Sequence, residues 1–295
     1  MDILNRKDDM VLAHAELPEG WEDRGASLEK YRNFCYPVKV SAEFEKGGSG
    51  VIYRTGEGYS WVAGADTRMP KTMFIDYMPF EDVDTYIANY AERLSNLTGK
   101  EFELLEKREV PFDEEAGKEK VRQHAYREIK RQGGGNKIGI AKLYYDQRCL
   151  VYKVGDKRVA INTHIEAVKA GMVSKKLNER LKDKVQYGPE DDLMSLNPLQ
   201  TLDWESNDIF VLVSDEESFE KDYADFISIY ESFKMDDNYE EESEAGKKEI
   251  QGKLFMSERF SKKMQIKKYA EWQNTSNAEK KASDEYMKEW IERYL

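Results

Sequence analysis

The sequence predicts an α+β fold, in which antiparallel strands are combined with amphipathic helices. Near the N-terminus, segments with alternating apolar and polar residues follow one another across glycine turns, as in antiparallel hairpins. Two later segments, residues 83–97 and 219–230, carry apolar residues at helical spacing. A strongly acidic stretch then separates these elements from a last helical region.

The N-terminal part is predicted to be a β-meander. Residues 10–21 form a short extended segment that ends in a Pro and Gly turn. Residues 34–45 alternate between apolar and polar side chains, which is typical of a half-buried strand. The glycine-rich residues 46–50 form a hairpin loop, and residues 51–53 and 59–63 are the strands that return.

The next segments alternate between helix and strand. Residues 83–97 form an amphipathic helix with acidic residues in its first turns, and a glycine at position 99 is a suitable stop. Residues 101–110 are extended again. Residues 113–131 form a charged helix that ends at the three glycines of residues 133–135.

The second half of the chain is predicted to complete the sheet. We expect strands at residues 138–145, 149–153, 158–163, 199–204 and 209–213. A turn is expected at residues 146–148 and a helix at residues 164–190. An acidic cap at residues 215–217 then begins the second amphipathic helix.

The acidic residues 236–244 are predicted to be a linker, so we place an α+β domain at residues 10–238 and a helical tail at residues 245–295. The tail has a basic segment at residues 261–268. Its aromatic residues are candidate partner-binding groups: Trp272, Tyr286, Trp290 and Tyr294. The tail could pack on its own domain, bind a partner helix or a second copy, or lie on a membrane surface.

The charge of the chain limits its partners. Its 58 acidic residues outnumber its 46 basic residues, which gives a formal net charge of -12. Such a surface repels nucleic-acid phosphates and anionic lipids, so we expect no nucleic acid and no membrane contact. The first nine residues have no signal-peptide core, and no run of about 18 apolar residues occurs. The chain is therefore predicted to be cytoplasmic.

The glycine clusters do not predict a nucleotide site. A phosphate loop needs a helix N-terminus directly after its glycines, whereas the clusters at residues 47–50 and 133–135 both precede strands. We interpret them as a hairpin loop and a helix stop. No cofactor is expected.

Residues that bind metals are few and scattered. The only His and Cys residues are His14, His124, His164, Cys35 and Cys149. None of them has the spacing of a zinc or iron site, no EF-hand loop occurs, and two cysteines are too few for a disulfide framework. We expect no metal site and a buried thiol at position 35.

No motif of an activated nucleophile occurs. Neighbouring carboxylates, at residues 82 and 84, 191–192 and 240–242, are expected to cap helices or face solvent. General acid–base catalysis requires such groups to converge on a pocket. The enzymatic alternative is a hydrolase with a dispersed Asp/Glu/His site, and it predicts that His124 or His164 faces carboxylates across a cleft.

The order of elements also carries a family resemblance. A Pro18-x-Gly20-Trp21 segment, a meander and the helix at residues 83–97 come first. A last strand then leads into a helix that reads Phe226-Ile227-x-x-Tyr230-x-Ser232-Phe233-Lys234. This order resembles the Mog/PsbP-like fold over about residues 10–238. The tail, with Trp272 followed by Ser283-Asp284-Glu285-Tyr286-Met287, is similar to the helical region after that domain in bacterial proteins of unassigned role.

The resemblance implies an antiparallel sheet with helices on both faces and a binding role rather than a catalytic one. It carries over no functional residues. We therefore expect a non-enzymatic protein-interaction or scaffold module that binds a protein partner or self-associates. The alternatives are the dispersed hydrolase and a peripheral membrane protein that attaches through its C-terminal helices.

Overall fold

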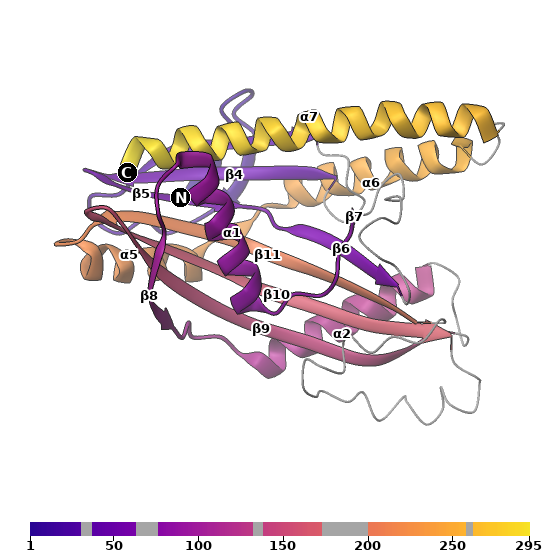
Figure 1. Ribbon diagram of the computed structural model, residues 1–295, viewed down its shortest axis with the longest axis horizontal. Helices are drawn as coiled ribbons and strands as arrows, with labels where there is room; N and C mark the ends of the chain where they lie inside the picture. The colour runs from indigo at the N-terminus through magenta and orange to yellow at the C-terminus, as the bar shows by residue number, and fades with distance from the viewer. Residues whose placement is uncertain (31–36, 63–75, 132–137, 173–199, 258–261) are drawn as a thin grey trace.

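A computed structural model describes residues 1–30, 37–62, 76–131, 138–172, 200–257 and 262–295 (Figure 1). The strands in these residues are β1 (Asp2–Leu4), β2 (Val11–His14), β3 (Glu22–Lys30), β4 (Val38–Lys46), β5 (Ser49–Arg54), β6 (Glu57–Val62), β7 (Asp76–Tyr77), β8 (Glu103–Arg108), β9 (Ile138–Val154), β10 (Lys157–Met172), β11 (Gln200–Asp215) and β12 (Lys234–Met235). The helices are α1 (Val83–Thr98), α2 (Glu114–Arg131), α5 (Phe219–Ser232), α6 (Asp237–Ser257) and α7 (Lys262–Tyr294). The predicted α+β class is confirmed.

One large sheet organises the molecule. Its strand order is β3-β4-β5-β11-β10-β9-β8, with antiparallel neighbours. The short β6 pairs with β11, and β7 pairs with β6 in parallel. One half of β11 pairs with β5 and the other half with β6. Gly56 lies where the chain passes from β5 to β6. A Cβ atom there would overlap the backbone carbonyl oxygen of Ser206 on β11, so only glycine fits.

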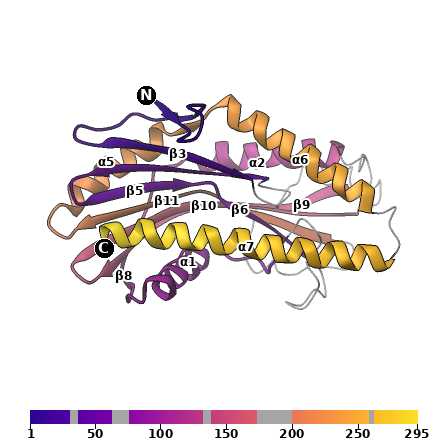
Figure 2. The same ribbon diagram turned by 90° about the horizontal axis from the view of Figure 1, so that it is seen from above.

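Helices cover both faces of this sheet, as predicted (Figures 1 and 2). α1 and α7 lie on one face and share a core that contains Ile87, Trp204 and Trp290. α5 lies on the other face, where Phe226 packs on Phe210 of β11. α2 packs on β9 and β10 on this second face, and the small sheet β1-β2-β12 completes the layer.

The C-terminal helices belong to the fold. In α7, Met287, Trp290, Ile291 and Tyr294 are buried in the core that α1 shares. Beside them, Arg293 Nη1 donates to Glu43 Oε2 of β4 at 2.9 Å. The predicted linker at residues 236–244 is wrong, because these residues form the start of α6. Their acidic side chains stabilise a helix N-terminus through its dipole.

The N-terminal residues also belong to the fold, which begins before the predicted residue 10. Ile3 is fully buried, and β1 pairs with β2. The amino group of Met1 donates to the carbonyl oxygen of Ala15 at 2.8 Å. The short apolar pattern of this segment did not predict a strand, because its pairing partner lies ten residues further along the chain.

Three strands are much longer than predicted. β9 runs through the predicted turn at residues 146–148, because these residues pair with β10. β10 continues to Met172 where a helix was predicted from residue 164, and its residues 165 and 167 are buried at strand spacing. β11 joins the two predicted strands at residues 199–204 and 209–213. Residues 173–199 lie outside the described residues.

Other predictions hold. α1 begins after Asp82, whose Oδ1 accepts a hydrogen bond from Thr85 N at 2.7 Å, and ends at Gly99 with φ 68°. β8 and α2 lie where they were expected. In the described part of the chain, every helix is too short or too polar to cross a lipid bilayer.

Candidate functional site

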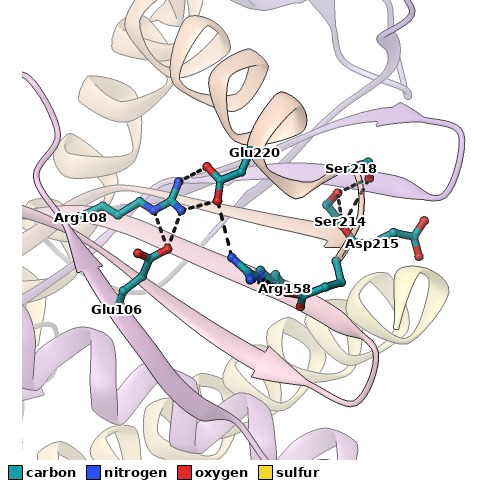
Figure 3. A network of polar contacts seen from close by, with 8 residues as sticks. Glu106, Arg108, Arg158, Ser214, Asp215, Ser218 and Glu220 are labelled. Carbon is teal, nitrogen blue, oxygen red and sulfur yellow. Dashed lines mark hydrogen bonds and ion pairs between the residues drawn. The ribbon is translucent and has the colours of Figure 1, made fainter.

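Polar side chains on the described elements form several clusters, three of which contact α5. The first of these three is a network of two arginines. Arg108 of β8 and Arg158 of β10 both point at Glu220 near the start of α5 (Figure 3). Glu106 also accepts a hydrogen bond from Arg108, and Glu216 accepts one from Arg158. Three carboxylates face two cations, so the network holds no spare positive charge for a phosphate ligand. We assign it the structural role of joining two strands to α5.

The second cluster surrounds Asp222 of α5, which is 2% exposed. Its Oδ2 accepts hydrogen bonds from Ser49 Oγ at 2.6 Å and from Ser214 Oγ at 2.7 Å. Lys46 Nζ donates to Asp222 Oδ1 at 2.9 Å and to Asp225 Oδ2 at 2.6 Å. Because both oxygens of Asp222 already have partners, this cluster also has a structural role, which is to fasten the β4–β5 hairpin to α5.

The third cluster, which we name the polar triad, consists of Gln147 on β9 with Asn162 and His164 on β10. Gln147 lies opposite His164 in the strand register, and Asn162 is two residues away on the same face. This face is the one that α5 and α2 cover. Gln147 and Asn162 are 1% and 0% exposed, and the side chain of His164 is 12% exposed.

The polar triad differs from the other two clusters because each of its members has a buried atom without a hydrogen bond of good geometry: Gln147 Oε1, His164 Nδ1 and Asn162 Nδ2, which faces the hydroxyl of Tyr230. Gln147 Nε2 donates to Tyr230 Oη at 2.6 Å and to Asn162 Oδ1 at 3.4 Å. Turning both amides over would again leave one amide donor and one amide acceptor unpaired. Each such atom costs about 1–3 kcal/mol when nothing binds it.

Two side chains border the triad on the same strands. The ring of Tyr145 lies 5.3 Å from the ring of His164, measured between centroids. His164 Nε2 is 3.5 Å from Glu166 Oε1. The imidazole therefore has one nitrogen beside a carboxylate, whereas the other, Nδ1, is buried without a hydrogen-bond partner.

A backbone irregularity lies next to the triad. The pairing of β10 with β11 shifts between Asn162 and His164, which makes a β-bulge. Asp208 of β11 lies at this bulge with φ 50°, a conformation that few residues other than glycine adopt. Tyr53 Oη donates to its Oδ1 at 2.9 Å. Bulges and strained residues occur preferentially beside functional sites.

Burial and nearby carboxylates shift the pKa values of the groups around the polar triad. Burial lowers the pKa of His164, but the hydrogen bond to Glu166 and the negative charges of Asp208 and Glu205 outweigh it and raise the pKa above its ordinary value. Burial raises the pKa of Tyr230 to about 12, so its hydroxyl stays protonated at neutral pH. The site therefore combines a basic imidazole with neutral phenol and amide groups.

We expect His164 to make the chain less stable as the pH rises. Its folded pKa lies above the ordinary value of 6.5, so its contribution is fully present below that value and is lost as the pH rises through the folded pKa. Denaturant unfolding at about pH 5.5 and about pH 8.5 is expected to show a larger loss in the unaltered chain than in His164→Gln. Equal losses in both chains would contradict the prediction.

The candidate residues of the C-terminal helix lie against their own domain. Trp290 and Tyr294 are buried, and the half-buried Tyr286 donates from its hydroxyl to Glu43. A partner could reach these three only if α7 left the sheet. Trp272 is on α7, but its side chain lies outside the described part of the structure.

The other predicted residues are also placed. Cys149 is a buried free thiol, whereas Cys35 lies outside the described residues, as does the side chain of His124. His14 lies in the small sheet between two carboxylates. The enzymatic alternative predicts that His124 or His164 faces carboxylates across a cleft. The carboxylate beside His164 is Glu166, which is two residues further along the same strand.

Sequence reasoning missed two of the three triad residues. Gln147 lies in the turn predicted at residues 146–148. Asn162 lies in the strand predicted at residues 158–163, and neither was predicted to be a site residue. One signal was present: Asn162 directly follows the apolar residues 159–161, and a polar residue in the middle of a buried strand needs a partner.

No group of three or more His, Cys, Asp and Glu side chains that could hold a metal ion occurs among the described residues. Comparisons with protein-family models, curated proteins and solved structures gave no match. The resemblance to the Mog/PsbP-like fold therefore stays a prediction.

Proposed function

We propose that the chain is a non-enzymatic binding protein that holds a small, uncharged polar ligand at the polar triad. The observation that supports this proposal is the set of unpaired atoms on Gln147, Asn162 and His164, which are neighbours on one face of two paired strands. Buried polar groups in folded proteins nearly always have a partner, either protein, water or ligand, and we propose that a small polar molecule fills this role for the three atoms.

The chemistry of the triad selects the ligand. Gln147 and Asn162 present one hydrogen-bond acceptor and one donor, which complement an amide or urea group. Glu166 and Asp208 give the region a negative potential, which disfavours carboxylate and phosphate ligands. Tyr145 adds an aromatic face beside the imidazole. An uncharged molecule with a carboxamide-like end fits this arrangement.

The neighbouring residues favour binding over covalent catalysis. The hydroxyl of Thr163 donates to the carbonyl oxygen of Asn207 at 2.8 Å, so no base activates it. Burial raises the pKa of Cys149 to about 12, which keeps its thiol protonated. We therefore propose recognition rather than turnover as the role of the site.

An NMR titration with acetamide and urea tests the proposal. In the whole chain, both probes are expected to shift the side-chain amide signals of Gln147 and Asn162 because they occupy the unpaired atoms. Acetate and phosphate are expected to leave these signals unchanged. In Gln147→Met the response is expected to disappear, and in Gln123→Met, the same change at an exposed residue of α2, it is expected to remain.

Two results would contradict the proposal. One is an equal response to acetamide and acetate, and the other is a set of shifts that are spread over the surface and do not include the triad. Both results are measured in the NMR titration of the unaltered chain, so the test does not depend on whether Gln147→Met folds.

A hydrolase centred on His164 is the second candidate, favoured by the contact between His164 and Glu166 and by the raised pKa of the imidazole. It predicts hydrolysis of p-nitrophenyl acetate that both His164→Gln and Glu166→Gln abolish and that Glu217→Gln, a change at an exposed residue, retains. Equal background hydrolysis by all four chains would remove this candidate.

We keep three further predictions with this proposal: a protein partner or self-association, the absence of membrane contact, and a cytoplasmic location. Light scattering coupled to size exclusion tests self-association directly. A shortened chain that ends at Asn238 is not a suitable control for this measurement. Such a chain lacks α7, so the core that this helix covers would be exposed and could itself cause association.

A further inference from the structure

His14 lies at the end of β2, and both of its ring nitrogens face carboxylates. Nδ1 is 2.9 Å from Asp2 Oδ1, and Nε2 is 2.8 Å from Asp236 Oδ2. An ionised carboxylate only accepts hydrogen bonds, so each nitrogen must carry a hydrogen. A neutral imidazole has one N–H and the imidazolium has two, so the geometry requires the protonated ring.

The two carboxylates belong to segments that are far apart in the sequence. Asp2 begins β1, the first strand of the chain. Asp236 directly precedes α6, its Oδ1 accepts a hydrogen bond from Asn238 N at 2.9 Å, and its own N donates to Leu12 O of β2 at 3.0 Å. His14 therefore ties the N-terminal strand and the start of α6 to the same strand.

We propose that His14 is a pH-operated latch, which holds β1 and the start of α6 against β2 while its ring is protonated and releases one of them when it loses a proton. The side chain of His14 is 44% exposed, so solvent can remove the proton without prior unfolding. After that loss, one carboxylate faces a nitrogen lone pair, and the contact changes from attraction to repulsion.

The charged groups around the latch favour the protonated state. Asp2 on β1 and Asp236 before α6 contact the ring, and Asp237 begins α6. Lys234 of β12 is the strand partner of His14, and the amino group of Met1 donates to Ala15 O. Hydrogen bonds to Asp236 and Asp2 raise the pKa of His14 above its ordinary value of 6.5. The stabilisation is therefore present below pH 6.5 and is lost as the pH rises through the folded pKa.

Two NMR measurements on the whole chain test the latch. The pKa of His14 comes from its imidazole signals, and the opening of β1 and of the first turn of α6 comes from amide exchange, expressed as protection factors at each pH. Each unit by which the folded pKa exceeds 6.5 is expected to lower the protection of these segments about tenfold once the pH is above that pKa. The central strands β10 and β11 are expected to keep their protection.

Matched variants separate the latch from a general pH effect. Asp2→Asn and Asp236→Asn each remove one carboxylate, so both are expected to lower the pKa of His14 and to reduce the pH dependence of exchange. Asp9→Asn makes the same change at an exposed residue of the same region and is expected to alter neither. A pKa at or below 6.5, or protection that does not change with pH in either β1 or the first turn of α6, would overturn the proposal, which is independent of the ligand site.

Discussion

Replacement of Trp290 by alanine is expected to lower the free energy of unfolding by about 3–5 kcal/mol. Trp290 of α7 is fully buried against α1 and the sheet, and its ring centroid lies 5.3 Å from that of Tyr294. Alanine would leave a cavity at this position and remove contacts that hold α7 on the sheet. Denaturant unfolding followed by circular dichroism measures the change.

Two variants give this prediction its controls. Trp290→Phe keeps a large ring and removes the Nε1–H, which is buried without a partner, so it is expected to cost much less than alanine. Glu289→Ala changes an exposed residue of the same helix and is expected to have little effect. A loss below about 1 kcal/mol in Trp290→Ala would mean that α7 does not pack on the sheet in solution.

Replacement of Asp222 by alanine is expected to destabilise the chain by about 3–5 kcal/mol. The change leaves Ser49 and Ser214 without their acceptor and removes one of the two carboxylates that bind Lys46. Asp222→Asn keeps the shape and an oxygen acceptor, so it is expected to cost less. Glu217→Ala, at an exposed residue just before α5, serves as the control. An Asp222→Ala chain as stable as this control would contradict the prediction.

The same residue contributes to acid sensitivity. Burial raises the pKa of Asp222, but hydrogen bonds from Ser49, Lys46 and Ser214 outweigh it and hold the pKa below its usual value of 3.8. A lowered pKa contributes stability that is present above pH 3.8 and is lost as the pH falls through the folded pKa. The difference in stability between the unaltered chain and Asp222→Asn is therefore expected to shrink in acid.

The two ends of α1 were predictable because they depend on neighbouring residues, whereas α5 begins after Ser218 and not at the acidic cap predicted at residues 215–217. The acidic cap before α1 and the glycine after it act within one turn of the helix, and both act as predicted. The linker predicted at the acidic residues 236–244 is a helix start instead, for a related reason. Acidic residues at a helix start are favourable, and the same composition is also typical of a linker. Local sequence cannot separate these two cases.

Strand lengths were not predictable from local pattern. Asp146, Gln147 and Arg148 have the composition of a turn, yet they continue β9 because β10 pairs with them along its whole length. Residues 164–172 of β10 contain strand-like alternation, but charged residues in that stretch also fit a helix. Pairing with β9 on one side and β11 on the other decided the outcome.

The sequence by itself determined the fold class, the amphipathic helices and the apolar face of β4, since these depend on the spacing of residues within a few positions. Only the tertiary structure decided what covers the polar face of β4. Glu43 is 2% exposed because α7 supplies Tyr286 and Arg293, about 250 residues later, as partners for its carboxylate, and Arg6 supplies a third. The same holds for the polar triad, where Gln147 meets Asn162 and Tyr230 through strand pairing and the docking of α5. A polar side chain is buried or exposed according to partners that the fold brings from distant segments, and no local pattern records them.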